Sequence, residues 1–253
     1  MTVNQRNSTL MALLMLQFLL VVAVVVLFFR RQPSVGSGHV AALTGAALMT
    51  VAAGLVAATY LRIFRRSRSI PVFFMVTFFI FTMLDATKWV QLLVLDSPWP
   101  HYAATVSRVT IFGHLSGALA LFGSGLYAGS HRLKWQGVAF ALGLFLTASL
   151  SWAIPIDSSV MPENLVFAAG FPASLDMLTA LLLILGVINY AEQAIVARDT
   201  RRAVTALSVL LIVVGRELLY HRTEIAMMFL GTGLFLAGGI TYALRNYRDY
   251  LLG

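Results

Sequence analysis

Asp85 and Lys88 stand three positions apart inside a long apolar stretch of the chain. On a helix this spacing places both side chains on one face, where a carboxylate and an ammonium group can form an ion pair. A charge at the centre of a bilayer costs about 2.5–3.5 kcal/mol on insertion scales, so residues of this kind are candidates for function. The pair suits an ion or substrate site, or a proton relay. The alternative is a neutralised pair that only fixes helix packing.

Further ionisable residues inside apolar stretches complete the predicted ligand-binding site. They are Arg108, His114, Asp176, Arg216 and Glu217. Arg108 and His114 are expected to meet the Asp85–Lys88 pair, because helices that follow one another in sequence usually pack as neighbours. Arg216 and Glu217 are expected at the mouth of the same site, with Arg216 as the best-buried donor for an anion or a headgroup.

Several of these residues also have a plainer interpretation. His114 can be a packing residue held by a hydrogen bond. It lies between Gly113 and Gly117, a small-residue spacing that predicts close approach of a neighbouring helix. Asp176, four residues after Pro172, can complement the positive end of a helix as a first-turn residue. The residues around Arg216 can form an interfacial turn whose basic side chains reach the headgroups.

The histidines and the absence of cysteine limit metal and haem chemistry. Two haem ligands on one helix need a separation of about fourteen residues, whereas His101, His114 and His131 are thirteen and seventeen residues apart. A single haem held by His114 and a histidine of another span, such as His221, stays open. No Glu-x-x-His or His-Glu-x-x-His motif occurs. We therefore predict no metal site and no catalytic residue, and the cofactor stays unknown.

Composition assigns these residues to a membrane. Hydrophobic residues make up 59% of the 253 positions and charged residues only 11%, against roughly 25% charged in soluble domains. This excludes a soluble enzyme, a disordered tail and a disulfide scaffold. The net charge of +8 does not indicate nucleic acid, because the basic residues lie at the ends of apolar runs. We predict one domain over 1–253, an all-α polytopic transmembrane helix bundle.

Eight stretches are long enough to cross a hydrocarbon core, which takes about 20 apolar helical residues. They are 8–29, 39–61, 71–95, 103–128, 135–154, 172–196, 203–220 and 225–243. The last two are short and are separated at GRELLYHRTE, which is too polar for the middle of a span, so seven spans is the alternative. The aromatic residues that open the third stretch are interpreted as facing lipid or a partner.

The basic residues predict the orientation, since they accumulate on the cytoplasmic side. With the N-terminus inside, twelve fall on the inner side: Arg6, Arg62, Arg65, Arg66, Arg68, Arg132, Lys134, Arg198, Arg201, Arg202, Arg245 and Arg248. Only Arg30, Arg31 and Arg222 fall outside. Both termini are therefore predicted to be cytoplasmic, in a multi-pass protein of the cell membrane. The outer loop 155–171 is expected to lie on the membrane or to fold over the mouth of the bundle.

The ionisable residues favour one side of the membrane. Apart from Glu192, they lie at central or outer depth in their spans, which predicts a polar cavity open to the extracytoplasmic side. The favoured function is binding or translocation of a small polar solute, an anion or a proton. The alternatives are a non-catalytic membrane subunit of a redox or biosynthetic complex, binding haem or a pigment, and an intramembrane lipid-modifying enzyme. The expected partners are the lipid bilayer and either another membrane protein or a second copy. A retinal protein is set aside, because 225–243 contains no lysine.

Overall fold

A computed structural model describes residues 3–31, 37–64, 69–95, 102–128, 136–157, 164–221 and 224–252. It confirms the predicted all-α bundle. The helices are α1 (Val3–Arg31), α2 (Ser37–Ile63), α3 (Ile70–Thr82), α4 (Thr87–Leu95), α5 (Ala103–Ala128), α6 (Gln136–Ala153), α7 (Pro172–Ala197), α8 (Thr200–His221) and α9 (Ile225–Leu252). A 3₁₀ turn, η1 (Met83–Ala86), joins α3 to α4.

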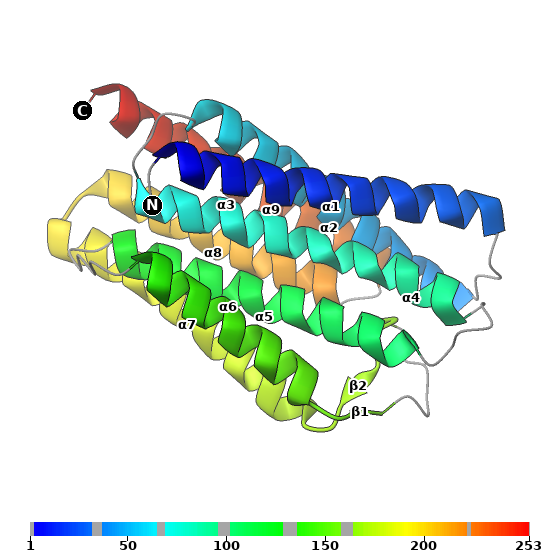
Figure 1. Cartoon of the computed structure of the whole chain (residues 1–253). Helices are drawn as coiled ribbons and strands as arrows, with labels where there is room; N and C mark the ends of the chain where they lie inside the picture. Colours follow the sequence, from blue (N-terminus) through cyan, green and yellow to red (C-terminus); the bar gives the residue numbers. More distant parts are fainter. Residues whose placement is uncertain are drawn as a thin grey trace.

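Seven helical segments of the described residues are long and apolar enough to cross a membrane, with α3, η1 and α4 forming one of them. The eighth, α6, has a shorter apolar part, Gly137–Ala153. The predicted separation of the last two spans is confirmed, because α8 ends at His221 and α9 begins at Ile225. The N- and C-terminal ends of the chain lie at the same end of the bundle (Figure 1). We call this end of the bundle the terminal end, and the opposite end of the bundle the hairpin end.

Some residues used in the sequence predictions lie outside the described residues. They are Arg65, Arg66, Arg68, His101, His131, Arg132, Lys134 and Arg222. The structure therefore tests neither the histidine spacing nor the full distribution of basic residues.

The segment from Ile70 to Leu95 is the central rod of the bundle. In its most apolar stretch of 18 residues, 83% of the residues are buried inside the protein, whereas the share is 17% in α1 and in α7. Phe74, Phe78, Phe79 and Phe81 are buried in the core, and Phe73 is half-buried. The expectation that these aromatic residues face lipid or a partner is therefore wrong. They lie inside because the apolar residues of α1, α6 and α7 supply the outer surface instead.

The central rod is interrupted at η1 without a proline at the break. Thr82 Oγ1 donates to the carbonyl of Phe78 at 2.8 Å, and Thr87 Oγ1 donates to that of Leu84 at 2.6 Å. Threonine hydroxyls that bond back to the preceding turn bend helices. Gly113 of α5 lies directly against the turn, since a Cβ there would be 2.6 Å from the Leu84 Cβ. The interruption places Asp85 between α2, α5 and α8.

Two short antiparallel strands close the hairpin end: β1 (Ile156–Asp157) and β2 (Ala168–Ala169). Just before β2, the side chains of Leu165, Val166 and Phe167 are buried. Leu165 packs with residues of α2 and α4, and the Phe167 amide donates to Ser107 Oγ of α5 at 3.0 Å. Of the two arrangements expected for this loop, the described part therefore folds over the mouth of the bundle.

Candidate functional site

Asp85 and Lys88 form the buried ion pair that their spacing predicted. Lys88 Nζ lies 3.0 Å from Asp85 Oδ1, and the two side chains are 2% and 4% exposed respectively. Lys88 Nζ also lies 4.4 Å from the centre of the Tyr220 ring, over its face. Apart from the ion pair, the Asp85 carboxylate has no hydrogen-bond partner among the described residues. A buried carboxylate with unused acceptor positions is a place for a water molecule or a proton.

Arg216 of α8 holds His114 of α5. Its Nη2 lies 2.7 Å from His114 Nδ1 and also donates to the His114 carbonyl at 2.7 Å. Because a guanidinium has only donors, Nδ1 must accept, and the neutral imidazole then carries its hydrogen on Nε2. The Tyr220 ring stacks on His114 with centroids 3.8 Å apart. The predicted close approach around His114 is confirmed at Gly113, where a Cβ would lie 2.6 Å from the Leu84 Cβ. At Gly117 a Cβ would be in ordinary contact, 3.5 Å from Arg216 Nη2.

Glu217 connects this pair to the surface. Its Oε1 lies 3.3 Å from Arg216 Nη1, and its Oε2 lies 3.9 Å from His114 Nε2 and 3.3 Å from His221 Nε2. The exposed fraction of the side chains falls along the series, from 42% for His221 to 29% for Glu217, 9% for His114 and 1% for Arg216. The contacts therefore lead from the surface at the hairpin end of α8 into the interior.

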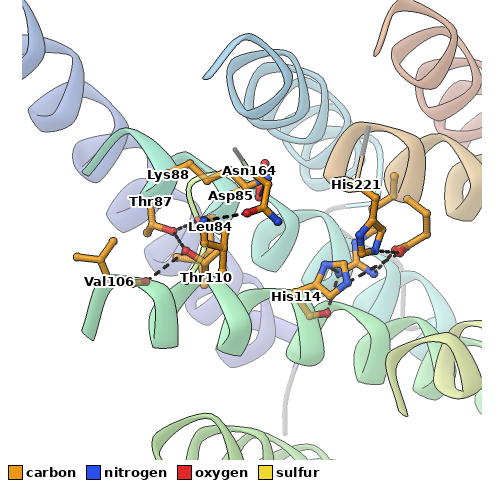
Figure 2. A network of polar contacts seen from close by, with 12 residues as sticks. Leu84, Asp85, Thr87, Lys88, Val106, Thr110, His114, Asn164 and His221 are labelled. Carbon is orange, nitrogen blue, oxygen red and sulfur yellow. Dashed lines mark hydrogen bonds and ion pairs between the residues drawn. The ribbon is translucent and has the colours of Figure 1, made fainter. Parts of the chain in front are cut away.

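A small cavity lies between the two groups of charges. Its volume is about 10 Å³, which suits about one water molecule. Its lining residues come from α2, the central rod, α5 and α8: Met49, Phe81, Thr82, Asp85, Thr110, His114, Arg216 and Tyr220. Figure 2 shows Asp85 and Lys88, with Thr87 and Thr110 beside them, in one group and His114 with His221 in the other.

Arg108 and Asp176 do not join the cluster. Arg108 Cζ lies 5.7 Å from the centre of the Trp152 ring of α6, so it does not meet Asp85 and Lys88 as expected. It stands two positions before Thr110, and two residues on a helix are about 200° apart, which turns Arg108 to the opposite face. Asp176 is exposed on α7. It is the fifth residue of that helix, so the first-turn interpretation is also wrong.

Three hydroxyl-bearing residues that were not singled out in the sequence line the cavity with the charged ones: Thr82, Thr110 and Tyr220. Each lies three or four positions from a residue of the site on the same helical segment. Their spacing therefore indicated that these residues lie on the same helix face as the site residues. Gln91, three positions after Lys88, is fully buried, and neither of its amide atoms has a hydrogen-bond partner in the described part of the chain.

Within the described part of the chain, His114, Glu217 and His221 form a group that could hold a metal ion. Their ligand atoms lie within 4.8 Å of one another, and two histidines with a glutamate is a set that zinc accepts. A histidine bound to a metal through Nε2 normally donates from Nδ1 to an acceptor. Here Nδ1 of His114 faces the guanidinium of Arg216 instead. The arrangement favours a hydrogen on Nε2 directed at Glu217. The single-haem hypothesis stays a prediction.

No protein-family model, curated protein or solved structure matches this chain. The side chains described above, and the order in which they contact one another, therefore carry the inference of function. Their common property is that acids and bases from the central rod, α5 and α8 converge on one water-sized cavity within the span.

Proposed function

We propose that this integral membrane protein binds and relays protons through the buried charges at the hairpin end. The observation that carries the proposal is the series from His221 through Glu217 to His114, along which exposure falls from 42% to 9%, with the fixed positive charge of Arg216, 1% exposed, at its inner end. Ionisable groups in contact, graded from surface to interior, are typical of proton relays in membranes. We take the hairpin end to be extracytoplasmic, in the cell membrane.

The size of the cavity favours a proton among the three cargoes that the sequence suggests. Pockets for small molecules usually enclose about 300–1,000 Å³, whereas this cavity has about 10 Å³. One water there would face the Arg216 guanidinium and the Asp85 carboxylate, which among the described residues has no hydrogen-bond partner beyond its ion pair with Lys88. Such a water would link the two groups of charges by hydrogen bonds without any rearrangement of the helices.

Asp85 is the proposed internal proton acceptor, and Glu217 with His221 forms the entrance. The groups that face Asp85 are Lys88 from its own rod, His114 from α5, and Arg216 and Tyr220 from α8. The lining residue from α2, Met49, does not ionise. A proton that binds to Asp85 neutralises the carboxylate and so breaks the ion pair with Lys88. Protonation at the cavity is thereby coupled to the packing of the central rod.

Infrared difference spectroscopy of the purified protein tests the proposal. A step to acidic pH should produce the carbonyl stretch of a newly protonated buried carboxyl group. Asp85→Asn should lose that band, because the amide cannot take up the proton. Asp176→Asn is the matched control, since Asp176 is exposed on α7, and it should retain the band. A band that survives unchanged in Asp85→Asn would overturn the role of Asp85.

The other functions suggested by the sequence stay separate hypotheses. A membrane subunit of a larger complex predicts a co-purifying protein or a coloured cofactor in mild detergent. A lipid-modifying enzyme predicts turnover of an added lipid that depends on Glu217 or His114. The graded chain of ionisable contacts favours the relay over both.

A further inference from the structure

A second buried polar chain lies in the half of the bundle toward the terminal end. Ser124 Oγ of α5 donates to the carbonyl of Pro71 at 2.8 Å and lies 2.6 Å from the Tyr190 hydroxyl of α7. The Tyr190 hydroxyl lies 2.8 Å from that of Tyr242 in α9. All three side chains are buried. Pro71 is the second residue of α3, so the chain ends close to where that helix begins.

The donor pattern gives this chain a direction. Since Ser124 gives its hydrogen to the Pro71 carbonyl, it accepts from Tyr190, and Tyr190 in turn accepts from Tyr242. Each hydroxyl can donate once and accept as well. Hydroxyl groups aligned in this way can pass a proton along by exchanging hydrogen bonds, and networks of this kind strengthen one another in a low dielectric.

Aromatic rings separate the two polar regions. Arg216 Cζ lies 5.5 Å from the centre of the Phe78 ring, and the centroids of Phe78 and Phe79 are 5.2 Å apart. Phe79 lies 5.5 Å from Tyr60, which stacks on Tyr242 at 5.9 Å. Phe235 contacts both phenylalanines. We call Phe78, Phe79 and Phe235 the aromatic layer; all three are fully buried.

We propose that the chain Ser124–Tyr190–Tyr242 is the exit of a complete transmembrane proton route, and that the aromatic layer is its barrier. This inference rests on the proposed proton relay and extends it from binding to translocation. The proton enters at His221 and Glu217, occupies Asp85, crosses the aromatic layer when water wets it, and adds to the Tyr242 hydroxyl. Tyr242 and Tyr190 each pass their own hydrogen to the next oxygen, and Ser124 releases its hydrogen from the Pro71 carbonyl to water at the start of α3, where Pro71 is half-buried. Apolar constrictions that gate by excluding water are known in channels.

Proton flux into liposomes that hold a pH-sensitive dye tests the inference, with a potassium diffusion potential as the driving force. Tyr190→Phe keeps the ring and removes the central hydroxyl, so the flux should fall about tenfold or more. Tyr127→Phe is the matched control, because the Tyr127 hydroxyl has no partner among the described residues, and its flux should equal that of the wild type. Phe235→Ser places a polar group in the aromatic layer and should raise the flux severalfold.

The outcomes separate this inference from the proposed function. Wild-type flux no faster than that of empty liposomes, with the Asp85 infrared band present, would overturn translocation and leave proton binding intact. Absence of the band from the wild-type protein would overturn proton binding itself. Equal flux in Tyr190→Phe and wild type would overturn the exit route. If Tyr190→Phe does not elute as folded protein, Ser124→Ala removes one oxygen from the same chain and decides the same question.

Discussion

Lys88 shows most clearly how one residue sets the character of the site. It is almost completely buried, and its ammonium group has an anion on one side and an aromatic face on the other. A buried ion pair contributes little net stability, but removing one partner leaves the other charge without compensation. The protein therefore tolerates the intact pair but is destabilised when either charge is lost. This suits a site where one bound proton changes the net charge.

Lys88→Met should destabilise the protein by about 3–5 kcal/mol, because it leaves the Asp85 carboxylate buried and unpaired. The double variant Lys88→Met with Asp85→Asn should recover much of that loss, since no charge is left to compensate. Thermal unfolding in a mild detergent measures both. A double variant as unstable as the single one would show that packing of the lysine, and not its charge, holds this region.

At the scale of residues, spacing predicted part of the site and missed another part. The three-residue interval predicted the Asp85–Lys88 pair, because the geometry of one helix fixes it. Arg108 was misplaced, because apolar composition on every side of α5 hides which face meets the central rod. The contact between Arg216 and His114 joins residues 102 positions apart, and no local pattern in a single sequence encodes such a contact.

Among the elements, the 3₁₀ turn η1 depends on the glycine that faces it. A Cβ at Gly113 would lie 2.6 Å from the Leu84 Cβ and 3.1 Å from the Phe81 carbonyl. The turn and α5 therefore approach as closely as they do only because position 113 has no side chain. Since Asp85 follows Leu84 directly, this contact also positions the carboxylate.

Gly113→Ala should destabilise the bundle by about 1–3 kcal/mol, as inserted methyl groups do in packed cores. It should also weaken the infrared band of Asp85, because η1 must move. Gly233→Ala is the matched control: nothing lies within 4 Å of its Cβ position. That change should be neutral or stabilise the helix by about 0.5–1 kcal/mol. Equal stability of the two variants would mean that the packing between α5 and η1 can accommodate an added methyl group.

Composition predicts neither the break at η1 nor the burial of the loop residue Leu165. Residues 71–95 are predominantly apolar despite Asp85 and Lys88, so hydropathy predicts one continuous helix there. The hydroxyls of Thr82 and Thr87 bond back to preceding carbonyls at the interruption, but Thr77 makes the same kind of bond inside α3, so a threonine does not mark a break in the sequence. Leu165 adopts a positive φ of 61° and is nevertheless buried; a left-handed leucine has no signature in a sequence.

For the molecule as a whole, length and hydropathy were enough to predict the helical segments. The expected span 103–128 coincides with α5, and 225–243 lies within the longer α9. The extension of α9 beyond residue 243 contains Arg245 and Asn246, polar residues that the predicted span left out. The even number of segments explains why the chain begins and ends at one end of the bundle (Figure 1).

The orientation of that bundle is a prediction that single cysteines can check, because the chain has none of its own. A membrane-impermeant maleimide should label Glu224→Cys, at the hairpin end, in intact cells. It should label Thr200→Cys, at the terminal end, only after lysis. Both native side chains are exposed. The reverse pattern would place the termini outside, despite the basic residues Arg62, Arg198 and Arg202 at the terminal end.

Two ion pairs of the cluster each lie within a single helical segment: Asp85 with Lys88, and Arg216 with Glu217. Each of these two helical segments therefore already contains the counter-ion of its buried charge when it leaves the ribosome and partitions into lipid. Neither segment has to wait for a later one to shield its charge during biosynthesis. The order in which the segments are synthesised therefore places no demand on the order in which they enter the bilayer, and the contacts between helices form afterwards.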